Sequence, residues 1–401
     1  MPSESPTVWK FELEKTLQAC TNDYRGTLWF LDDNVPFLAA VMKAAAAISV
    51  FALLVIRAEL RLDLALEQAK ILPEPPSALT TLRMIHHSHP HLIKGFSPLE
   101  KETASSYDWS RAETYKEISG SRRVTVAVTD DGLADSVREC HDGRKTFVKA
   151  LEIEMTVSQL IEKLGRSGDQ DSFIYYLQSQ DGNIYRDQPS PSGPPELEAF
   201  QKYIKKDVPW MKEAIGKQAE AVNLWIGDSR STTSLHHDPY ENIYHVLAGS
   251  KTFTLLSPLE TIHLDQRFYP PSTLKRSSSG QLYPEYDYPD PSYGPRIPWV
   301  GNLCLPRSAR SISVTLHEGD TLFLPAGWWH RVEQKEGEEG IAVAVNYWYP
   351  SEILPERYAY ERFFRRIGIM SGMEGLIPPM GDEESINSGE DDDSDRYSAS
   401  Q

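Results

Sequence analysis

The chain has 401 residues, of which 40% are hydrophobic and 25% are charged, and these values are typical of one large globular domain with extensions or of two ordinary domains. The 58 acidic residues outnumber the 41 basic residues and leave a formal net charge of -17, which disfavours nucleic acid as a partner and suits a basic protein partner. A solvated acidic tail and general solubility also account for this charge. The three cysteines are scattered without a CxxC pair, which argues against a disulfide framework and favours a reducing compartment, the cytoplasm or also the nucleus.

Residues 1–75 are expected to form an N-terminal helical extension, because the run 57–70 is rich in good helix formers. Residues 36–56 (PFLAAVMKAAAAISVFALLVI) are almost entirely apolar, and their length is borderline for a membrane span. A long charged stretch precedes them, which argues against a signal peptide. We favour a buried or amphipathic helix. A membrane anchor, or a segment that is not part of the native fold, remains as an alternative.

Residues 76–220 are expected to form a mixed α/β region that supports the segment after it. Residues 123–132 (RVTVAVTDDG) alternate like a strand and end in a turn. Residues 156–165 (TVSQLIEKLG) begin with a helix cap and end at glycine, which predicts a helix. Residues 173–182 (FIYYLQSQDG) predict another strand followed by a turn.

Residues 221–350 are dense in short strands separated by Gly, Pro and Asp turns, a pattern that predicts a sandwich or barrel. Within them, residues 266–301 are rich in Tyr, Pro and Ser and are expected to form one long functional or flexible loop. A C-terminal helical segment is predicted over 351–380, and a disordered acidic tail over 381–401. The predicted fold class is therefore mainly β with flanking helices (α+β).

A metal site is predicted from the segment SLHHDPY, in which His236 and Asp238 are two residues apart. On an extended strand, residues at this spacing project from the same face, so an imidazole and a carboxylate lie side by side. Another imidazole would complete a facial triad for Fe(II), with open positions for a keto acid and dioxygen. His330, in the later strand TLFLPAGWWHRV, is the expected third ligand. HxD alone is a weak signal, whereas HxD followed by GDTLFLPAGWWH is specific.

A keto acid such as 2-oxoglutarate carries a distal carboxylate that needs a cation and hydroxyl donors. Strand parity places Tyr244 on the face of Asp238, and Lys251 is expected to lie across a hairpin from Tyr244. An exposed lysine is the alternative. Thr233, just before the HxD motif, offers a further hydroxyl. Asn346 lies in a strand that is hydrophobic on both faces, so either a ligand contact or a structural hydrogen bond accounts for it.

The stretch 222–258 (VNLWIGDSRSTTSLHHDPYENIYHVLAGSKTFTLLSP), with LPAGWWHRV and AVNYWY further on, resembles the JmjC hydroxylases. Among them it is most similar to the small JmjC protein lysyl hydroxylases, and the similarity runs from about Leu82 through Phe364. The resemblance implies a double-stranded β-helix (jelly-roll or cupin) core over 221–350. It also implies Fe(II), 2-oxoglutarate as cosubstrate, and O2.

The resemblance also implies roles for individual residues. The metal ligands and catalytic residues would be His236, Asp238 and His330. The residues that contact 2-oxoglutarate would be Tyr176 on an earlier strand, Thr233, Tyr244, Lys251 and Asn346. No ligand position is substituted, so an active enzyme is expected. The implied reaction is hydroxylation of a lysyl side chain in a protein substrate, and a GTPase of the DRG type is the expected class.

Several alternatives remain open, because the motifs describe only the iron and the cosubstrate. Asparaginyl hydroxylation and histone-lysine demethylation use the same site, although no chromatin-reader or zinc-finger pattern is present. The triad could also serve zinc-dependent peptidase activity, and the domain could be a non-catalytic cupin-like interaction module. The C-terminal helical residues around Tyr358, Phe363 and Phe364 are expected either to form a homodimer interface, as in related JmjC hydroxylases, or to pack on the barrel.

Overall fold

The computed structural model describes residues 68–164, 173–188, 190, 193–291, 294–301, 309–351, 365, 366 and 369. The strands and helices named below all lie in one compact unit, Leu66–Ile353. The predictions for residues 1–67, for the segment around Tyr358, Phe363 and Phe364, and for the acidic tail lie outside the described residues. No helix among the described residues is long and apolar enough to cross a membrane.

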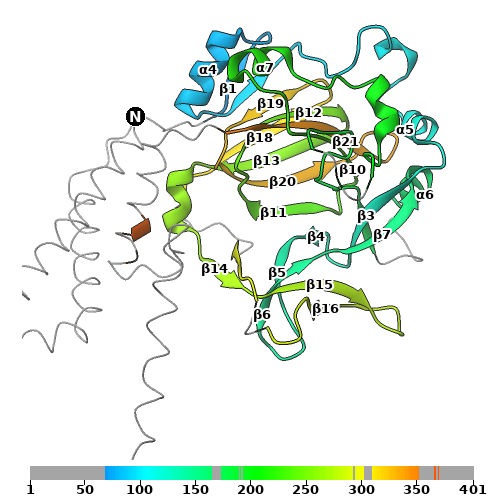
Figure 1. Ribbon diagram of the computed structural model, residues 1–401, viewed down its shortest axis with the longest axis vertical. Helices are drawn as coiled ribbons and strands as arrows, with labels where there is room; N and C mark the ends of the chain where they lie inside the picture. The colour runs from blue at the N-terminus through cyan, green and yellow to red at the C-terminus, as the bar shows by residue number, and fades with distance from the viewer. Residues whose placement is uncertain are drawn as a thin grey trace, which may run out of the picture. The chain divides into compact units, whose positions relative to one another are not determined.

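Two β-sheets form the core of this unit, as Figure 1 shows, and the predicted mainly β fold is confirmed. The larger sheet has seven strands in the order β1 (Lys70–Leu72), β2 (His91–Ile93), β19 (Thr321–Leu324), β12 (Tyr240–Ala248), β21 (Ala342–Pro350), β10 (Ala221–Gly227) and β9 (Tyr185–Arg186). The smaller sheet has five strands in the order β18 (Ile312–His317), β13 (Ser250–Leu256), β20 (Trp329–Lys335), β11 (Thr232–His236) and β4 (Leu133–Ala134).

Strands from the first half of the chain join both sheets, because β1, β2 and β9 extend the larger sheet and β4 extends the smaller one. A three-stranded sheet lies beside them, with β7 (Leu151–Thr156), β3 (Arg123–Thr129) and β8 (Ile174–Tyr176) in that order. The flanking helices are α4 (Ala78–His87), α5 (Ala112–Ser119), α6 (Val157–Lys163) and α7 (Pro209–Ile215). Thus β3, α6 and β8 confirm three of the elements predicted from sequence, and α6 begins with a capping box between Thr156 and Gln159.

The inner faces of the two sheets pack against each other. Tyr244 and Val246 of β12 share a buried cluster with Phe253 and Leu255 of β13, whereas Ile243 belongs to the cluster on the opposite face of its sheet. This alternation follows from the period of two along a strand. It confirms the parity that the sequence predicted for Tyr244.

The predicted hairpin between residues 240–248 and 250–256 is wrong. Gly249 has a φ of 69°, and a Cβ there would lie 2.5 Å from the carbonyl oxygen of Lys335, so the chain turns tightly at this residue. The turn leads from one sheet to the other: β12 pairs with β19 and β21, whereas β13 pairs with β18 and β20. Tyr244 therefore meets β13 across the core, where its ring centroid lies 5.0 Å from that of Phe253.

The long loop predicted over 266–301 is also wrong. This part of the chain contains β14 (Gln266–Tyr269), β15 (Pro271–Arg276), β16 (Leu282–Tyr286) and β17 (Ile297–Val300). β14 pairs with β17, and β15 lies between β16 and β6 (Lys145–Lys149), which in turn pairs with β5 (Ser136–Glu139). Pro271 is the first residue of its strand and Pro284 lies on the edge strand β16, two positions where a missing N–H is tolerated. The proline content therefore did not prevent strand formation.

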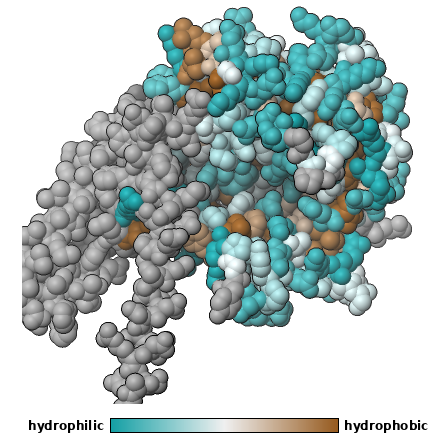
Figure 2. Space-filling view, viewed as in Figure 1, coloured by the Kyte–Doolittle hydropathy of each residue, from teal (hydrophilic) through white to brown (hydrophobic). Residues whose placement is uncertain are grey.

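The described surface in Figure 2 is mostly hydrophilic, with a hydrophobic patch over α4. Ile71 of β1 and Leu79 and Leu82 of α4 are among the most exposed large hydrophobic side chains of the described residues. Because β1 is an edge strand, this patch adjoins an unpaired sheet edge. This patch is formed by β1 and α4, and neither element carries one of the predicted metal ligands.

Candidate metal centre

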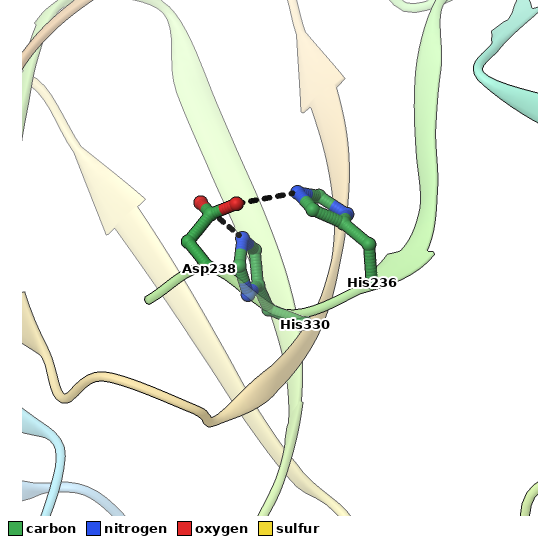
Figure 3. Close-up of side chains that lie close together, drawn as sticks. All are labelled: His236, Asp238 and His330. Carbon is green, nitrogen blue, oxygen red and sulfur yellow. Dashed lines mark ion pairs between the residues drawn. The ribbon is translucent and has the colours of Figure 1, made fainter. Parts of the chain in front are cut away.

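The three predicted metal ligands converge at one end of the smaller sheet (Figure 3). His236 ends β11, His330 lies near the start of β20, and the two are register partners with ring centroids 4.2 Å apart. Asp238 follows β11 directly, with its carboxylate oxygens 3.9 Å from Nε2 of His236 and 3.6 Å from Nε2 of His330. Among the described residues this is the only group of three or more His, Cys, Asp or Glu side chains whose candidate ligand atoms lie within 4.8 Å of one another.

Hydrogen bonds to the main chain orient both imidazoles. Nδ1 of His236 donates to the carbonyl of Ser234 at 2.8 Å, and Nδ1 of His330 donates to the carbonyl of Trp328 at 3.0 Å. Each Nε2 therefore keeps its lone pair for a metal. Burial, and then the neighbouring His236, lower the pKa of His330 to about 4, so this ring is neutral near pH 7.

The donor set fits a ferrous ion. Two imidazoles and one carboxylate on one side of an ion are the facial triad of non-haem iron oxygenases. Bonds of about 2.1 Å would hold neighbouring ligand atoms about 3 Å apart, so a small contraction of the observed spacing is sufficient. The opposite face of such an ion stays open for further ligands.

The inner face of the smaller sheet leads from the metal ligands to Lys251. Along β13 and β20, the paired residues are first Leu255 with His330, then Phe253 with Val332, and last Lys251 with Gln334. Lys251 thus lies four residues (334 minus 330) deeper than His330 along β20, which corresponds to about 13 Å at ~3.3 Å per residue. The lysine side chain and a five-carbon keto acid together can span this interval.

Lys251 is completely buried, so the alternative of an exposed lysine is excluded. Its Nζ donates a hydrogen bond to Oε1 of Gln334, and it lies 3.5 Å from the hydroxyl of Tyr176 and 5.3 Å from the centre of that ring. No carboxylate among the described residues pairs with it, and burial alone lowers its pKa to about 7. An anion that reached Nζ of Lys251 would compete with no carboxylate of the described residues.

Two hydroxyl groups accompany the lysine. The hydroxyls of Tyr176 and Tyr244 are neighbours, and burial raises the pKa of both, so both remain neutral donors. Thr233 of β11 is the register partner of Val332. Because Val332 lies between His330 and Gln334 on β20, Thr233 lies between the metal ligands and Lys251 along the sheet. The structure thus brings together Tyr176, Tyr244 and Lys251 and places Thr233 beside them.

Asn346 takes part in a hydrogen-bond network inside the larger sheet. Its Oδ1 accepts from Nε1 of Trp225 at 2.9 Å and from Nδ2 of Asn223 at 3.3 Å. Its Nδ2 donates to Oδ1 of Asn242 at 3.2 Å. These bonds give the buried asparagine structural partners, and its contact with 2-oxoglutarate stays a prediction.

Two residues of this region were not singled out from the sequence: Gln334 and Trp225. A signal for Gln334 existed, because it lies four residues after His330 on the same strand and therefore on the same face. Nothing local distinguished Trp225 from a core tryptophan, because its contact with Asn346 bridges two strands.

Comparison with known proteins agrees with the fold. Residues 76–354 match the model of the cupin-like domain family. The chain therefore belongs to the cupin-like domain family and, within it, to the JmjC oxygenases, enzymes that use Fe(II) and 2-oxoglutarate.

Three relatives of this chain carry different names. The chain is 32% identical over 265 residues to the human "bifunctional peptidase and (3S)-lysyl hydroxylase JMJD7", an alignment that covers 64% of this chain and 76% of that protein. It is 28% identical to JmjC domain-containing protein E of Dictyostelium discoideum, over 73% of this chain and 86% of the relative. It is 30% identical to lysine-specific demethylase JMJ32 of Arabidopsis thaliana, over 61% and 71% respectively.

Proposed function

We propose that this chain is an Fe(II)- and 2-oxoglutarate-dependent protein hydroxylase that acts on a lysyl side chain. His236, Asp238 and His330 would hold the metal, and Lys251 would hold the distal carboxylate of the cosubstrate. The observation that carries this proposal is Lys251 itself: a fully buried lysine without an anionic partner among the described residues, placed on the same inner sheet face as the three candidate metal ligands.

When bound, iron and 2-oxoglutarate supply the activation of dioxygen, coupled to decarboxylation of the keto acid. The residues of this chain position these groups. His236, Asp238 and His330 would hold the ion through one ligand atom each. Lys251 with the hydroxyls of Tyr176 and Tyr244 would bind the distal carboxylate, which aims the keto group at the metal. Phe253 and Val332, buried between the two ends, would keep water away from the cosubstrate.

A lysyl side chain in a protein, with a DRG-type GTPase as the class, is the substrate we propose. The name of the human relative supports lysyl hydroxylation, and the net charge of -17 suits a substrate with basic residues. The peptidase in the same name and the demethylase name of the Arabidopsis relative define the main alternatives. The Lys251 pocket argues against a hydrolase, because a zinc-dependent hydrolysis has no use for a buried cation and two tyrosines at this depth.

The test is release of succinate with candidate protein substrates, followed by intact-mass analysis. A hydroxylase gives succinate together with a single added oxygen on the substrate. A demethylase gives succinate and a loss of mass from a methylated substrate, and an asparaginyl hydroxylase places the oxygen on a different residue. A hydrolase forms product without 2-oxoglutarate, and an interaction module releases no succinate; either result would reject the proposal.

A further inference from the structure

The residue that orients His236 lies in an irregular part of its strand. β11 pairs with β20 through Thr233 and through His236, but the register shifts between these two residues. Ser234 and Leu235 therefore lie opposite a single residue of β20, which makes this segment a β-bulge. The ladder is interrupted at a bulge, so it does not by itself fix the carbonyl of Ser234 that accepts from Nδ1 of His236. Contacts from outside the strand must hold Ser234 in place.

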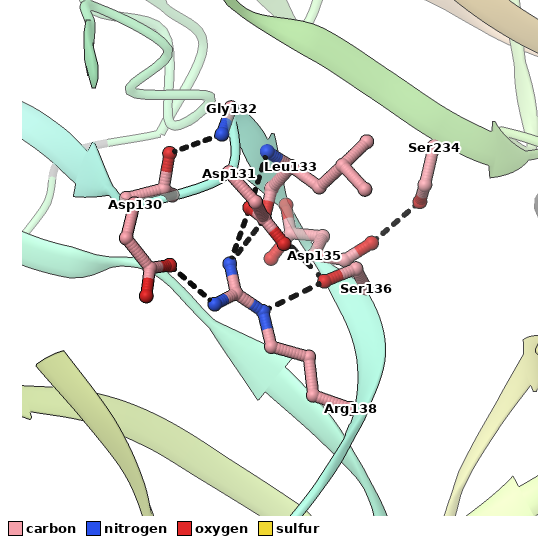
Figure 4. A network of polar contacts seen from close by, with 9 residues as sticks. Asp130, Asp131, Gly132, Leu133, Asp135, Ser136, Arg138 and Ser234 are labelled. Carbon is pink, nitrogen blue, oxygen red and sulfur yellow. Dashed lines mark hydrogen bonds and ion pairs between the residues drawn. The ribbon is translucent and has the colours of Figure 1, made fainter. Parts of the chain in front are cut away.

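The hydroxyl of Ser234 receives such contacts from two other segments of the chain. Its Oγ donates to the main-chain carbonyl of Asp135, in the link between β4 and β5, as Figure 4 shows. The start of β4 is closely packed, because a Cβ on Gly132 would lie 1.9 Å from the carbonyl oxygen of Arg230. The same Oγ accepts from Nε1 of Trp299, in β17, at 3.2 Å. The hydroxyl is thus used both as donor and as acceptor.

The indole of Trp299 also lies against the metal ligand itself. Its ring and the imidazole of His236 have centroids 5.9 Å apart and planes within 7°, which is an offset parallel stack. A contact with the face of an imidazole leaves both of its nitrogens available in the ring plane. The ring of Phe147, with its centroid 4.7 Å away, packs against the same indole. Trp299 therefore contacts His236 directly and also acts on it through Ser234.

The strand that carries Trp299 is attached to the smaller sheet next to both imidazole ligands. Val300, the next residue of β17, shares a buried cluster with Leu235 and Trp329. Leu235 directly precedes His236, and Trp329 directly precedes His330. The position of Trp299 relative to the metal centre is therefore set by packing on both sides of its own side chain.

We propose that Trp299 is a positioning residue for His236. It fixes the bulge at Ser234 and lies against the imidazole, so that Nε2 of His236 already points toward the metal position before a metal binds. This inference rests on the proposed function, because it takes His236 as a metal ligand. It assigns a role in metal binding to the segment 266–301, which carries none of the predicted ligands.

The first experiment measures the dissociation constant for Zn²⁺, a metal without redox chemistry, by competition with a chromophoric chelator. Loss of a group that orients a metal ligand typically weakens metal binding about tenfold to a hundredfold, so Trp299→Leu should raise this constant about tenfold. Trp299→Phe keeps a ring beside His236 but has no N–H, and should raise it only about threefold. The matched control is Tyr283→Leu, which removes an exposed ring from β16 and should change nothing.

A double-mutant cycle tests the route through Ser234. Ser234→Ala removes the hydroxyl that the N–H of Trp299 reaches but keeps the carbonyl that serves His236. Both variants remove the same hydrogen bond, so Trp299→Phe should weaken Zn²⁺ binding no further in the Ser234→Ala protein. Full additivity of the two losses would overturn the inference.

NMR of the Zn²⁺-loaded protein provides a signal that a purely structural role would not change selectively. In Trp299→Leu, the Nδ1 proton of His236 should exchange with water faster. The Nδ1 proton of His330 should be unaffected, because it is held by the carbonyl of Trp328. Faster exchange of both protons or of neither would overturn the inference. Circular dichroism of the metal-free variants checks folding, and if Trp299→Leu does not fold, Trp299→Phe and Ser234→Ala replace it in this measurement.

His236→Ala separates this inference from the proposed function, because it sets the background for Zn²⁺ binding. If the unmodified protein binds Zn²⁺ no more tightly than His236→Ala, the proposed function fails. If the unmodified protein binds more tightly and Trp299→Leu keeps the full affinity, only the role of Trp299 fails.

Discussion

Replacing Lys251 with methionine should stabilise the empty protein and at the same time abolish its response to 2-oxoglutarate. Lys251 is completely buried, and its pKa of about 7 lies well below the ordinary value of 10.5. The unfolded chain therefore binds a proton more tightly than the folded chain. The resulting destabilisation is complete below pH 7 and disappears as the pH rises through about 10.5.

The magnitude follows from these two pKa values. At 1.36 kcal/mol per pH unit, their difference corresponds to about 4–5 kcal/mol below pH 7, and to about 4 kcal/mol at pH 7.5. Methionine removes this cost but leaves Oε1 of Gln334 without its donor, which costs about 1–3 kcal/mol. The net gain is about 2 kcal/mol. For a folded unit of this size, that gain raises the melting midpoint by about 4–8 °C.

The assay is thermal unfolding of the metal-loaded protein at pH 7.5, with and without 2-oxoglutarate. At a hundredfold excess over its dissociation constant, the cosubstrate should stabilise the unmodified protein by about 2.7 kcal/mol and Lys251→Met scarcely at all. Lys145→Met is the matched control, because Lys145 is exposed on β6 and should change neither midpoint.

Two results would refute this reasoning. A lower midpoint for empty Lys251→Met would show that the buried charge does not destabilise the fold. A 2-oxoglutarate shift of normal size in Lys251→Met would show that the distal carboxylate binds elsewhere, and the proposed cosubstrate site would then be rejected.

Three further predictions concern the metal ligands, the pH and the loop beside the site. His236→Ala or Asp238→Ala should reduce 2-oxoglutarate-dependent succinate release to background while circular dichroism of the metal-free protein stays unchanged, and substantial turnover in both variants would reject the metal assignment. The dissociation constant for 2-oxoglutarate should rise about tenfold per pH unit from pH 7.5 to 9, because Lys251 must take up a proton on binding. A dissociation constant that calorimetry finds unchanged over this range would contradict the role of Lys251. Gly132→Ala should lower the free energy of unfolding, measured in urea, by about 3 kcal/mol or more, because the new Cβ meets the carbonyl oxygen of Arg230 and φ is 80°. An unchanged unfolding midpoint would show that the loop relaxes freely.

Much of the candidate site was accessible from local sequence, because strand periodicity is a local property. The two-residue spacing of His236 and Asp238 and the parity of Tyr244 required only that these segments be extended. The segment around His330 was specific enough to name the third ligand. The capping box of α6 was likewise readable from neighbouring residues.

What periodicity could not provide is the pairing of strands that are far apart in the chain. The sheet to which β13 belongs was mispredicted, because a turn at Gly249 is compatible with a hairpin and with a crossing between sheets, and only the long-range partners β18 and β20 decide between them. The four strands within 266–301 were missed for the same reason, since β15 finds its parallel partner β6 more than a hundred residues earlier.

The same distinction separates the residues that the sequence identified from those that only the tertiary structure revealed. Gln334 reaches Lys251 across 83 residues of chain, and Asp135 reaches Ser234 across 99. Backbone hydrogen bonding between strands brings these side chains together, and no local pattern records which strands will pair. The amino-acid sequence alone therefore determined the metal-binding chemistry, whereas the folded sheets decided which groups surround it.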